Sequence, residues 1–481
     1  GSTSPPPALH IHPYPMNRVL CVALLLLAIV CSVSCDYEFI EDQLVITNAE
    51  RTIDAKGPYM IETTHLDFES TTRTPINYLY YIQDLTNAKK VALIRAWRDE
   101  DGALLSCDEW EPLDMLTGNK YWRIDFLHTL KKYEQYSITV EVWFADALNL
   151  EPFARTIGMP PRVQLDITAE LLSCYTVESQ TTTVDVNNDN IYEYSEFPKP
   201  SQRLEGGVKY GPYGITDPFT TSPVSLYYET ITAFVSAELD RDVYLSHWAG
   251  GFRSEDHYAL HNTGGEVSTY SAVELAASIK RFSRVRHMPF PYFRVSLPYI
   301  CEGIDYHDRI GNISTSVVHS IRGKETSLSL SPRSPLLPNY RTEFDVHYNY
   351  PNQQPEGPMV FRNPFNNVYS ARVHLAREVD PVLLYTRIKT CFHLPAGATD
   401  INLMAPFSTE SSLEHSHYFL DYPTHPVLCI ERGRTVPAAI SEPVEITYTL
   451  EADDLWTKLT YPIVGVMAIL TVLTAIRALM A

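Results

Sequence analysis

Three stretches of the chain alternate apolar and other residues with a period of two. The longest runs from Tyr136 to Phe144, and the same period recurs over 344–350 and 444–450. Successive side chains of a strand point to opposite faces, so this period predicts strands with one buried face. The chain holds 34 Pro and 31 Tyr but only 20 Gly, which is typical of short strands joined by proline-containing turns. We therefore expect a mainly β protein with few helices, among them a short one over 272–280.

A short apolar run lies near the N-terminus. Met16 and a nearby cation precede apolar residues 19–33, and small residues follow. This order is typical of a secretory signal peptide, which we assign to residues 16–35 with cleavage near Cys35. A buried helix is the alternative, but the run has no polar face to present to water. Residues 1–15 are then a leader or a gene-model extension.

A second apolar run lies near the C-terminus, where Leu459–Ile476 is a stretch of 18 predominantly apolar residues. At about 1.5 Å rise per residue it extends about 27 Å, close to the hydrocarbon core of about 30 Å. Trp456 at its leading edge and Arg477 at its far end suit the membrane interfaces. We expect a transmembrane helix over 456–478, a short cytosolic end over 479–481 and, with the signal removed, a type I topology.

The segment between the two apolar runs is about 420 residues long, too long for one core and suited to two domains. Its alternating strands predict sheets with one buried face, so we expect two tandem antiparallel β-sandwich-like lumenal domains. The chain carries a formal net charge of −20 and a pI of about 5.2. Such a composition offers no basic stripe to phosphates and argues against a nucleic-acid partner.

The cysteines that follow the signal peptide are odd in number for an oxidising compartment. They are Cys107, Cys174, Cys301, Cys391 and Cys429. No Cys-x-x-Cys occurs, so a zinc ribbon or a redox motif has no support. If pairing respects the two domains, Cys391–Cys429 is the favoured disulfide and Cys107–Cys174 a second candidate, which leaves Cys301 free. The sequence does not fix the connectivity, because a bridge needs Cα atoms within about 7 Å.

One acidic segment has the ligand spacing of an EF-hand calcium loop. The residues at positions 1, 3, 5, 9 and 12 of that pattern are Asp185, Asn187, Asp189, Glu193 and Glu196. The flanks do not fit, because a strand-like run precedes the segment and a proline follows it where a helix should continue. A structural turn is therefore favoured over a calcium site.

A few histidines near the end of the second domain are another possible metal site. His415 and His417 lie two residues apart, as on one face of a strand, and His425 follows. Zinc sites need three or four converging ligands, so exposed loop histidines are the favoured interpretation. No Gly-x-Ser-x-Gly elbow or glycine-rich phosphate loop occurs. We therefore expect no catalytic, cofactor-binding or metal-binding residue in this chain.

The chain has one Asn-x-Ser/Thr acceptor, at Asn312 within the run Tyr306–Ser316. Such an acceptor is expected on an exposed turn in a secretory compartment, and we expect Asn312 to carry a glycan. The run and the later Arg333, Pro335 and Leu336 together resemble the ribophorin I family. Further matches follow in the family's order, at Asn48–Asp54, Tyr210–Tyr213, Ser246–Trp248, His261–Gly264 and Leu394–Ala398.

The resemblance implies a non-catalytic accessory subunit of the oligosaccharyltransferase complex in the endoplasmic reticulum membrane. That complex transfers a preassembled glycan from dolichyl diphosphate to Asn of Asn-x-Ser/Thr. Its catalytic residues and divalent metal would belong to a separate multispan subunit, and nascent secretory polypeptides would be further partners. The resemblance also implies two β domains, at 36–229 and 230–453. The alternatives are an independent type I lumenal receptor or chaperone that binds polypeptides and, with least support, a stand-alone lumenal hydrolase.

Overall fold

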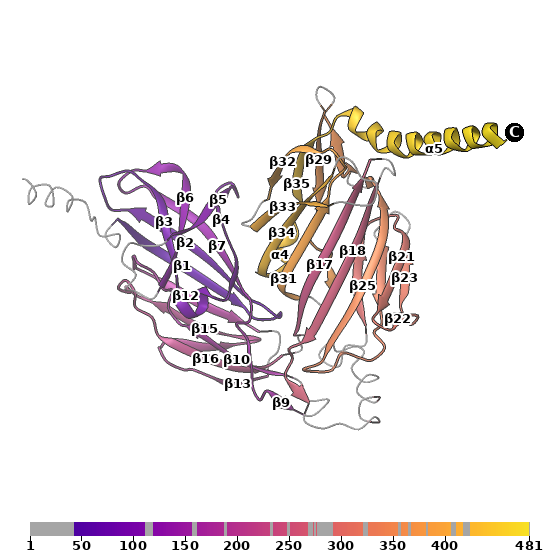
Figure 1. Cartoon of the computed structure of the whole chain (residues 1–481). Coiled ribbons are helices and arrows are strands. Elements are labelled where there is room, and N and C mark those ends of the chain that lie inside the picture. Colours follow the sequence, from indigo (N-terminus) through magenta and orange to yellow (C-terminus); the bar gives the residue numbers. More distant parts are fainter. Residues whose placement is uncertain are drawn as a thin grey trace, which may run out of the picture.

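The described chain folds into two β-rich lobes followed by one long helix (Figure 1). The signal peptide expected over 16–35 and the leader over 1–15 lie outside the described residues, as does most of the helix expected over 272–280. The computed structural model describes residues 43–480 apart from 111–118, 156–160, 187–189, 231–233, 248–250, 268–272, 274–275, 277–291, 321–325, 355–356, 364–366, 381–382, 406–409 and 417–423.

The N-terminal lobe runs from β1 to β16 and includes one single-turn helix, α2 (Leu85–Ala88). Its longer strands are β1 (Leu44–Asp54), β2 (Met60–Ser70), β3 (Ile76–Asp84), β4 (Val91–Arg98), β5 (Leu104–Trp110), β6 (Asn119–Leu130), β7 (Gln135–Phe144), β10 (Arg162–Thr168), β12 (Gln180–Asp185), β15 (Gly207–Tyr213) and β16 (Pro223–Glu229). The short ones are β8 (Asn149–Leu150), β9 (Ala154–Arg155), β11 (Thr176–Val177), β13 (Ile191–Tyr194) and β14 (Ser201–Leu204).

The C-terminal lobe runs from β17 to β35 and includes the short helix α4 (Pro437–Ile440). Its longer strands are β17 (Val235–Ser246), β18 (Gly251–Asn262), β20 (Phe293–Leu297), β21 (Glu302–Asp308), β24 (Thr326–Leu330), β25 (Arg341–Pro351), β29 (Val368–Val373), β31 (Leu384–His393), β32 (Thr399–Met404), β33 (Glu410–Ser416), β34 (His425–Thr435) and β35 (Val444–Thr449). The short ones are β19 (Glu266–Val267), β22 (Gly311–Asn312), β23 (Val317–Ser320), β26 (Gln353–Gln354), β27 (Gly357–Pro358), β28 (Val360–Arg362) and β30 (Val379–Asp380).

Each lobe buries its own core between sheets. In the N-terminal lobe an eleven-stranded sheet and the sheet β13-β16-β10-β8 contribute to one cluster of buried side chains, which ends at Phe234. In the C-terminal lobe the eight-stranded sheet β22-β21-β25-β18-β17-β31-β34-β33 shares a second cluster, which begins at Val235, with two four-stranded sheets. Most ladders are antiparallel, while β1–β12 and β17–β31 are parallel.

The strands expected from the alternating pattern are all present. In β7 every second residue is buried, namely Tyr136, Ile138, Val140, Val142 and Phe144. The stretches 344–350 and 444–450 form most of β25 and β35, again with alternate burial. The expectation of a mainly β, sandwich-like protein is therefore confirmed, because in each of these strands the period of two separates a core face from an outer face.

The two lobes touch through a small apolar cluster and a few hydrogen bonds. Arg432 Nη2 donates to the carbonyl of Ala92 at 3.2 Å, and Arg434 Nη1 donates to the carbonyl of Lys89 at 2.7 Å. β9 and β19 form a short parallel ladder between the lobes. The buried members of the apolar cluster are Tyr59, Ala92, Ala145, Leu384, Val436 and Ala439.

The long helix α5 (Ala452–Met480) leaves the C-terminal lobe and contains the expected span at 456–478. Its stretch Pro462–Leu479 has a mean hydropathy of 2.0, and none of it is buried against the protein. A helix of this length and composition is sufficient to cross a membrane.

Candidate functional site

Asn312 lies at the end of a tight hairpin between β21 and β22, at one edge of the eight-stranded sheet. Asp308 pairs with Gly311 in the ladder, so two residues form the turn. The side chain of Asp308 accepts hydrogen bonds from the backbone N–H groups of Ile310 (2.9 Å) and Gly311 (3.0 Å). Gly311 has φ +140°, a backbone conformation that residues other than glycine rarely adopt. We call residues 308–316 the acceptor turn.

Arg333 fastens the acceptor turn to the segment that follows β24. Its Nε donates to Asp308 Oδ2 at 2.6 Å, and its Nη2 donates to Asp308 Oδ1 at 3.2 Å. The same Nη2 reaches the carbonyl oxygens of Gly311 (3.1 Å) and Asn312 (3.3 Å). The Arg333 guanidinium, helped by the N–H groups of the turn, lowers the pKa of Asp308 to about 2. The arginine and the turn, both part of the family-like sequence pattern, thus form one unit.

Exposure alternates along the acceptor sequence itself. Asn312 and Ser314 are exposed, whereas Ile313 between them is only 2% exposed and belongs to the core of the lobe. Ser316 is buried, and its Oγ accepts a hydrogen bond from the N–H of Ser331 at 3.0 Å. The acceptor amide and its hydroxyl therefore face solvent from a backbone that is fixed on both sides.

A buried ion pair lies within the sheet that carries the acceptor turn. Arg241 Nε on β17 lies 3.1 Å from Asp256 Oδ1 on β18, and both side chains are fully buried. Ser254 accepts from Arg241 at 3.1 Å and donates to Asp256 at 2.6 Å. Tyr348 on β25 donates to Asp256 Oδ2 at 3.0 Å, and burial raises the pKa of this tyrosine. The network joins three neighbouring strands and satisfies both charges.

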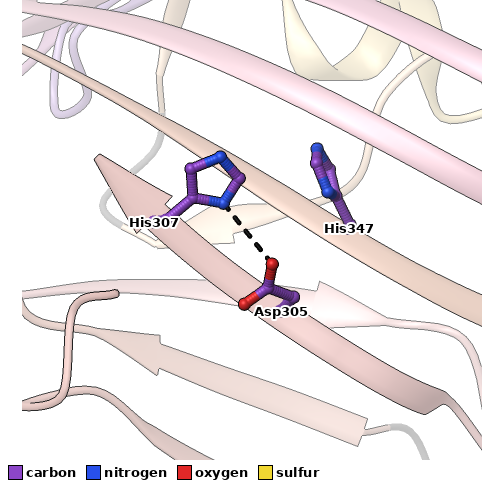
Figure 2. A group of neighbouring side chains, drawn as sticks. All are labelled: Asp305, His307 and His347. Carbon is purple, nitrogen blue, oxygen red and sulfur yellow. Dashed lines mark ion pairs between the residues drawn. The ribbon is translucent and has the colours of Figure 1, made fainter. Parts of the chain in front are cut away.

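On the outward face of the same sheet, three titratable side chains come together (Figure 2). Asp305 and His307 project from β21 and His347 from β25, and one ligand atom of each lies within 4.8 Å of the others. Within the described part of the chain, this is the one group of three or more His, Cys, Asp or Glu side chains able to hold a metal ion. This group was not predicted from the sequence, although the i, i+2 spacings of Asp305 with His307 and of Asp345 with His347 were visible signals.

The favoured disulfide is present. Cys391 is linked to Cys429, and the two residues lie directly opposite each other in the ladder between β31 and β34. Opposed residues of antiparallel strands point their side chains to the same face, so their sulfur atoms come within bonding reach. Cys301 is free, as the same pairing scheme expected.

The second pairing, Cys107–Cys174, is wrong, because the two cysteines are not linked to each other. Cys107 lies on β5, whereas the Cys174 thiol contacts the carbonyl of Tyr80 on β3 at 4.0 Å. β6 lies between these strands, which puts them about two strand spacings, or roughly 10 Å, apart and out of bridging range. Burial raises the pKa of the Cys107 thiol to about 12, as suits a packed, unreactive cysteine.

The calcium-like segment 185–196 is spread over separate strands. Asp185 ends β12 and forms an ion pair with Lys56 at 3.2 Å, while Glu193 lies on β13. Residues 187–189 lie outside the described residues. The strand-like run before the segment is β12, so a strand stands where an EF-hand has its first helix.

The histidines considered for zinc have separate partners. His415 is exposed on β33, and its Nδ1 lies 3.5 Å from Thr424 Oγ1. His425 Nδ1 lies 3.0 Å from the carbonyl oxygen of Leu394. His417 lies outside the described residues. Among the residues that are described, neither imidazole belongs to a group able to hold a metal ion.

Known proteins resemble this chain over most of its length. The Ribophorin I family matches residues 44–477. Subunit 1A of the dolichyl-diphosphooligosaccharide–protein glycosyltransferase of Arabidopsis thaliana is 30% identical over 63% of this chain and 48% of that protein. Subunit 1 from Caenorhabditis elegans is 25% identical over 87% of this chain and 69% of that protein. Subunit 1B from Arabidopsis thaliana is 25% identical over 85% of this chain and 87% of that protein.

The matches differ in the share of each protein that they cover, and this share limits the conclusion that each match supports. The chain spans about half the length, 48%, of the first of these relatives. A solved zinc metallopeptidase from Deinococcus radiodurans covers 43% of this chain and 48% of that one at 9% identity and a TM-score of 0.25, too remote to support any conclusion. The family match, in contrast, includes both lobes, the acceptor turn and most of α5. The chain therefore belongs to the ribophorin I family.

Proposed function

We propose that this protein is a non-catalytic accessory subunit of an oligosaccharyltransferase complex. The observation that carries the proposal is the family match over residues 44–477, with relatives named as subunit 1 of the dolichyl-diphosphooligosaccharide–protein glycosyltransferase. In this role the chain supports transfer of a glycan from its dolichyl diphosphate carrier to Asn of Asn-x-Ser/Thr in nascent polypeptides. Its partners are the other subunits, including a multispan catalytic subunit.

The non-catalytic role is supported by two acidic side chains that are buried in ion pairs with arginines. Glu62 forms an ion pair with Arg51 at 2.6 Å, and Asp256 forms one with Arg241 at 3.1 Å. Both carboxylate side chains are fully buried, where a substrate cannot reach them to exchange a proton. These groups stabilise the lobes, while the chemistry and the divalent metal of glycan transfer belong to the catalytic subunit.

The proposed location is the endoplasmic reticulum membrane, with α5 as a single type I span and both lobes in the lumen. The apolar, unburied stretch Pro462–Leu479 supports the anchor. The disulfide Cys391–Cys429 supports an oxidising compartment, and an exposed acceptor at Asn312 supports exposure to the glycosylation machinery.

Native gel electrophoresis of gently solubilised membranes tests the proposal. A tagged full-length chain should migrate with a multispan glycosyltransferase in one high-mass band. Depletion of the chain should lower glycosylation of reporter proteins partially and unequally, whereas loss of a catalytic acid or base usually costs about 100-fold or more. A chain that migrates apart from any glycosyltransferase while it holds unrelated polypeptides would instead identify the alternative, an independent lumenal receptor or chaperone.

A further inference from the structure

We propose that Asp305, His307 and His347 form a zinc site that fastens β21, the strand that leads to the acceptor turn, to β25. The site is independent of the proposed function, because it concerns only side chains of the C-terminal lobe. The site would offer two imidazoles and one carboxylate, with the fourth position open to water.

The ladder between β21 and β25 brings the three ligands together. Asp305 lies opposite His347, and His307 lies opposite Asp345. The alternate residues Ile304 and Tyr306 pack against the core, so Asp305 and His307 project from the outer face. The rings of His307 and His347 meet edge to face with their centroids 5.2 Å apart. The backbone thus places two imidazoles and one carboxylate on one patch of the sheet (Figure 2).

One nitrogen of His307 lacks a hydrogen-bond partner although it is buried. Its Nδ1 is shielded from solvent and accepts or donates no hydrogen bond, and Asp305 Oδ2 lies 3.5 Å away. A shielded polar atom without a hydrogen bond is costly, and a metal ion between the imidazole and the carboxylate removes that cost.

The other nitrogen of His307 already has the surroundings of a metal ligand. Its Nε2 lies 3.5 Å from Asp345 Oδ2, and Asp345 Oδ1 lies 2.7 Å from Nδ1 of His257. Histidines that bind metal through one nitrogen usually direct the other to a carboxylate, which fixes the ring and raises its basicity. Asp345 therefore acts as a positioning residue that faces His307 from the neighbouring strand.

The donor set favours zinc over the oxygen-preferring cations. Two imidazole nitrogens and one carboxylate oxygen are typical zinc ligands, whereas calcium and magnesium prefer oxygen ligands alone. Zinc bonds of about 2.0–2.1 Å place tetrahedral ligand atoms about 3.3 Å apart, so these side chains need to close by at most about 1.5 Å. Half-exposed side chains reach such positions by rotamer changes without movement of the strands.

A metal at this point would strengthen the short ladder that pairs β21 with β25. The register between β21 and β25 shifts between Glu302 and Asp305, so the continuous ladder covers only Asp305, Tyr306 and His307. β22 beyond it is paired with β21 alone and forms the edge of the sheet. A bridge from Asp305 and His307 to His347 would secure this short ladder and, with it, the base of the acceptor turn.

The test uses the full-length chain in detergent, purified without a histidine tag and stripped with a chelator. Zinc affinity is measured by competition with a chromogenic chelator, and the zinc retained after dialysis is measured by mass spectrometry. The wild type should bind one zinc ion tightly, and His307→Gln and His347→Gln should each abolish this binding. Asp345→Asn should weaken the zinc affinity by about 10- to 100-fold. His319→Gln, on the exposed strand β23 outside the cluster, should bind as the wild type does.

Hydrogen exchange of the wild type gives a readout that needs no variant. Zinc should slow exchange of the β21 amides and leave those of β7 in the other lobe unchanged. The proposal is overturned if the wild type binds no zinc after stripping, if His347→Gln retains the wild-type equivalent in a folded chain, or if saturating zinc leaves β21 exchange unaltered.

Discussion

Arg333 and Asp308 form a two-point ion pair that closes the acceptor turn, with Nε 2.6 Å from Oδ2 and Nη2 3.2 Å from Oδ1. The same arginine binds the carbonyl oxygens of Gly311 and Asn312. The Arg333 side chain therefore neutralises the Asp308 carboxylate at the start of the turn. It also donates hydrogen bonds to the two carbonyl oxygens at the end of the turn. The conformation of the acceptor asparagine depends on a residue that is 21 positions away in the sequence.

We expect Arg333→Gln to loosen the acceptor turn in a pH-dependent way. Arg333 lowers the pKa of Asp308 to about 2 from an ordinary value of 3.8, so the pair stabilises the fold fully above about pH 4. That contribution is lost as the pH falls through about 2, when the carboxylate takes up its proton. Amide exchange at Ile310 and Gly311 should therefore be faster in the variant near neutral pH, and the difference should shrink under acidic conditions.

A matched control for this experiment is Arg309→Gln. Arg309 is 83% exposed and forms an ion pair with Glu343 rather than with Asp308. It lies within the turn but should leave exchange of the two amides nearly unchanged. Equal exchange rates in the wild type and Arg333→Gln at neutral pH would contradict the role given to Arg333.

We expect a glycan on Asn312, because the amide and the Ser314 hydroxyl are both exposed on a fixed turn. Treatment with an N-glycosidase should increase the gel mobility of the wild type. Asn312→Gln and Ser314→Ala should each migrate like the treated protein, while Asn402→Gln, at an exposed asparagine outside any acceptor sequence, should not. Wild-type mobility that is unaffected by the glycosidase would remove this expectation.

We expect reduction to destabilise the C-terminal lobe selectively. The disulfide Cys391–Cys429 closes a loop with a sequence separation of 38, which the chain-entropy treatment values at up to about 4 kcal/mol. Reductant should lower the unfolding temperature of the wild type and of Cys107→Ala, but not that of a variant that lacks both Cys391 and Cys429. Peptide mapping without reduction should recover the linked pair, and separate peptides would contradict the pairing.

We expect Asp256→Asn to destabilise the C-terminal lobe by about 3–5 kcal/mol, because it leaves the buried Arg241 guanidinium without its counter-charge. Glu255→Gln on the same strand is the control. Glu255 pairs with Arg253 at 2.6 Å on the surface, where such a pair is worth at most about 1 kcal/mol. Denaturant unfolding measures both, and equal losses in the two variants would mean that the buried network adds no special stability.

The local sequence pattern was sufficient to predict the strands and to favour one disulfide. The alternation over 136–144 predicted β7 because a period of two is a property of the backbone itself. Cys391 and Cys429 could be favoured because both lie in apolar strands of one domain. The same reasoning failed for Cys107 and Cys174, since membership of one domain does not say which strand lies between two others.

The sequence by itself determined the strand-rich architecture, the apolar helix near its end, the single glycan acceptor and, through short ordered motifs, the family. These features depend on spacing along the chain or on residue type. Only the tertiary structure decided that Arg333 meets Asp308 and that Asp305, His307 and His347 share one patch. Both contacts depend on the register of β21 against β25 and on the return of the chain after β24, and such long-range pairings leave no periodic trace in the sequence.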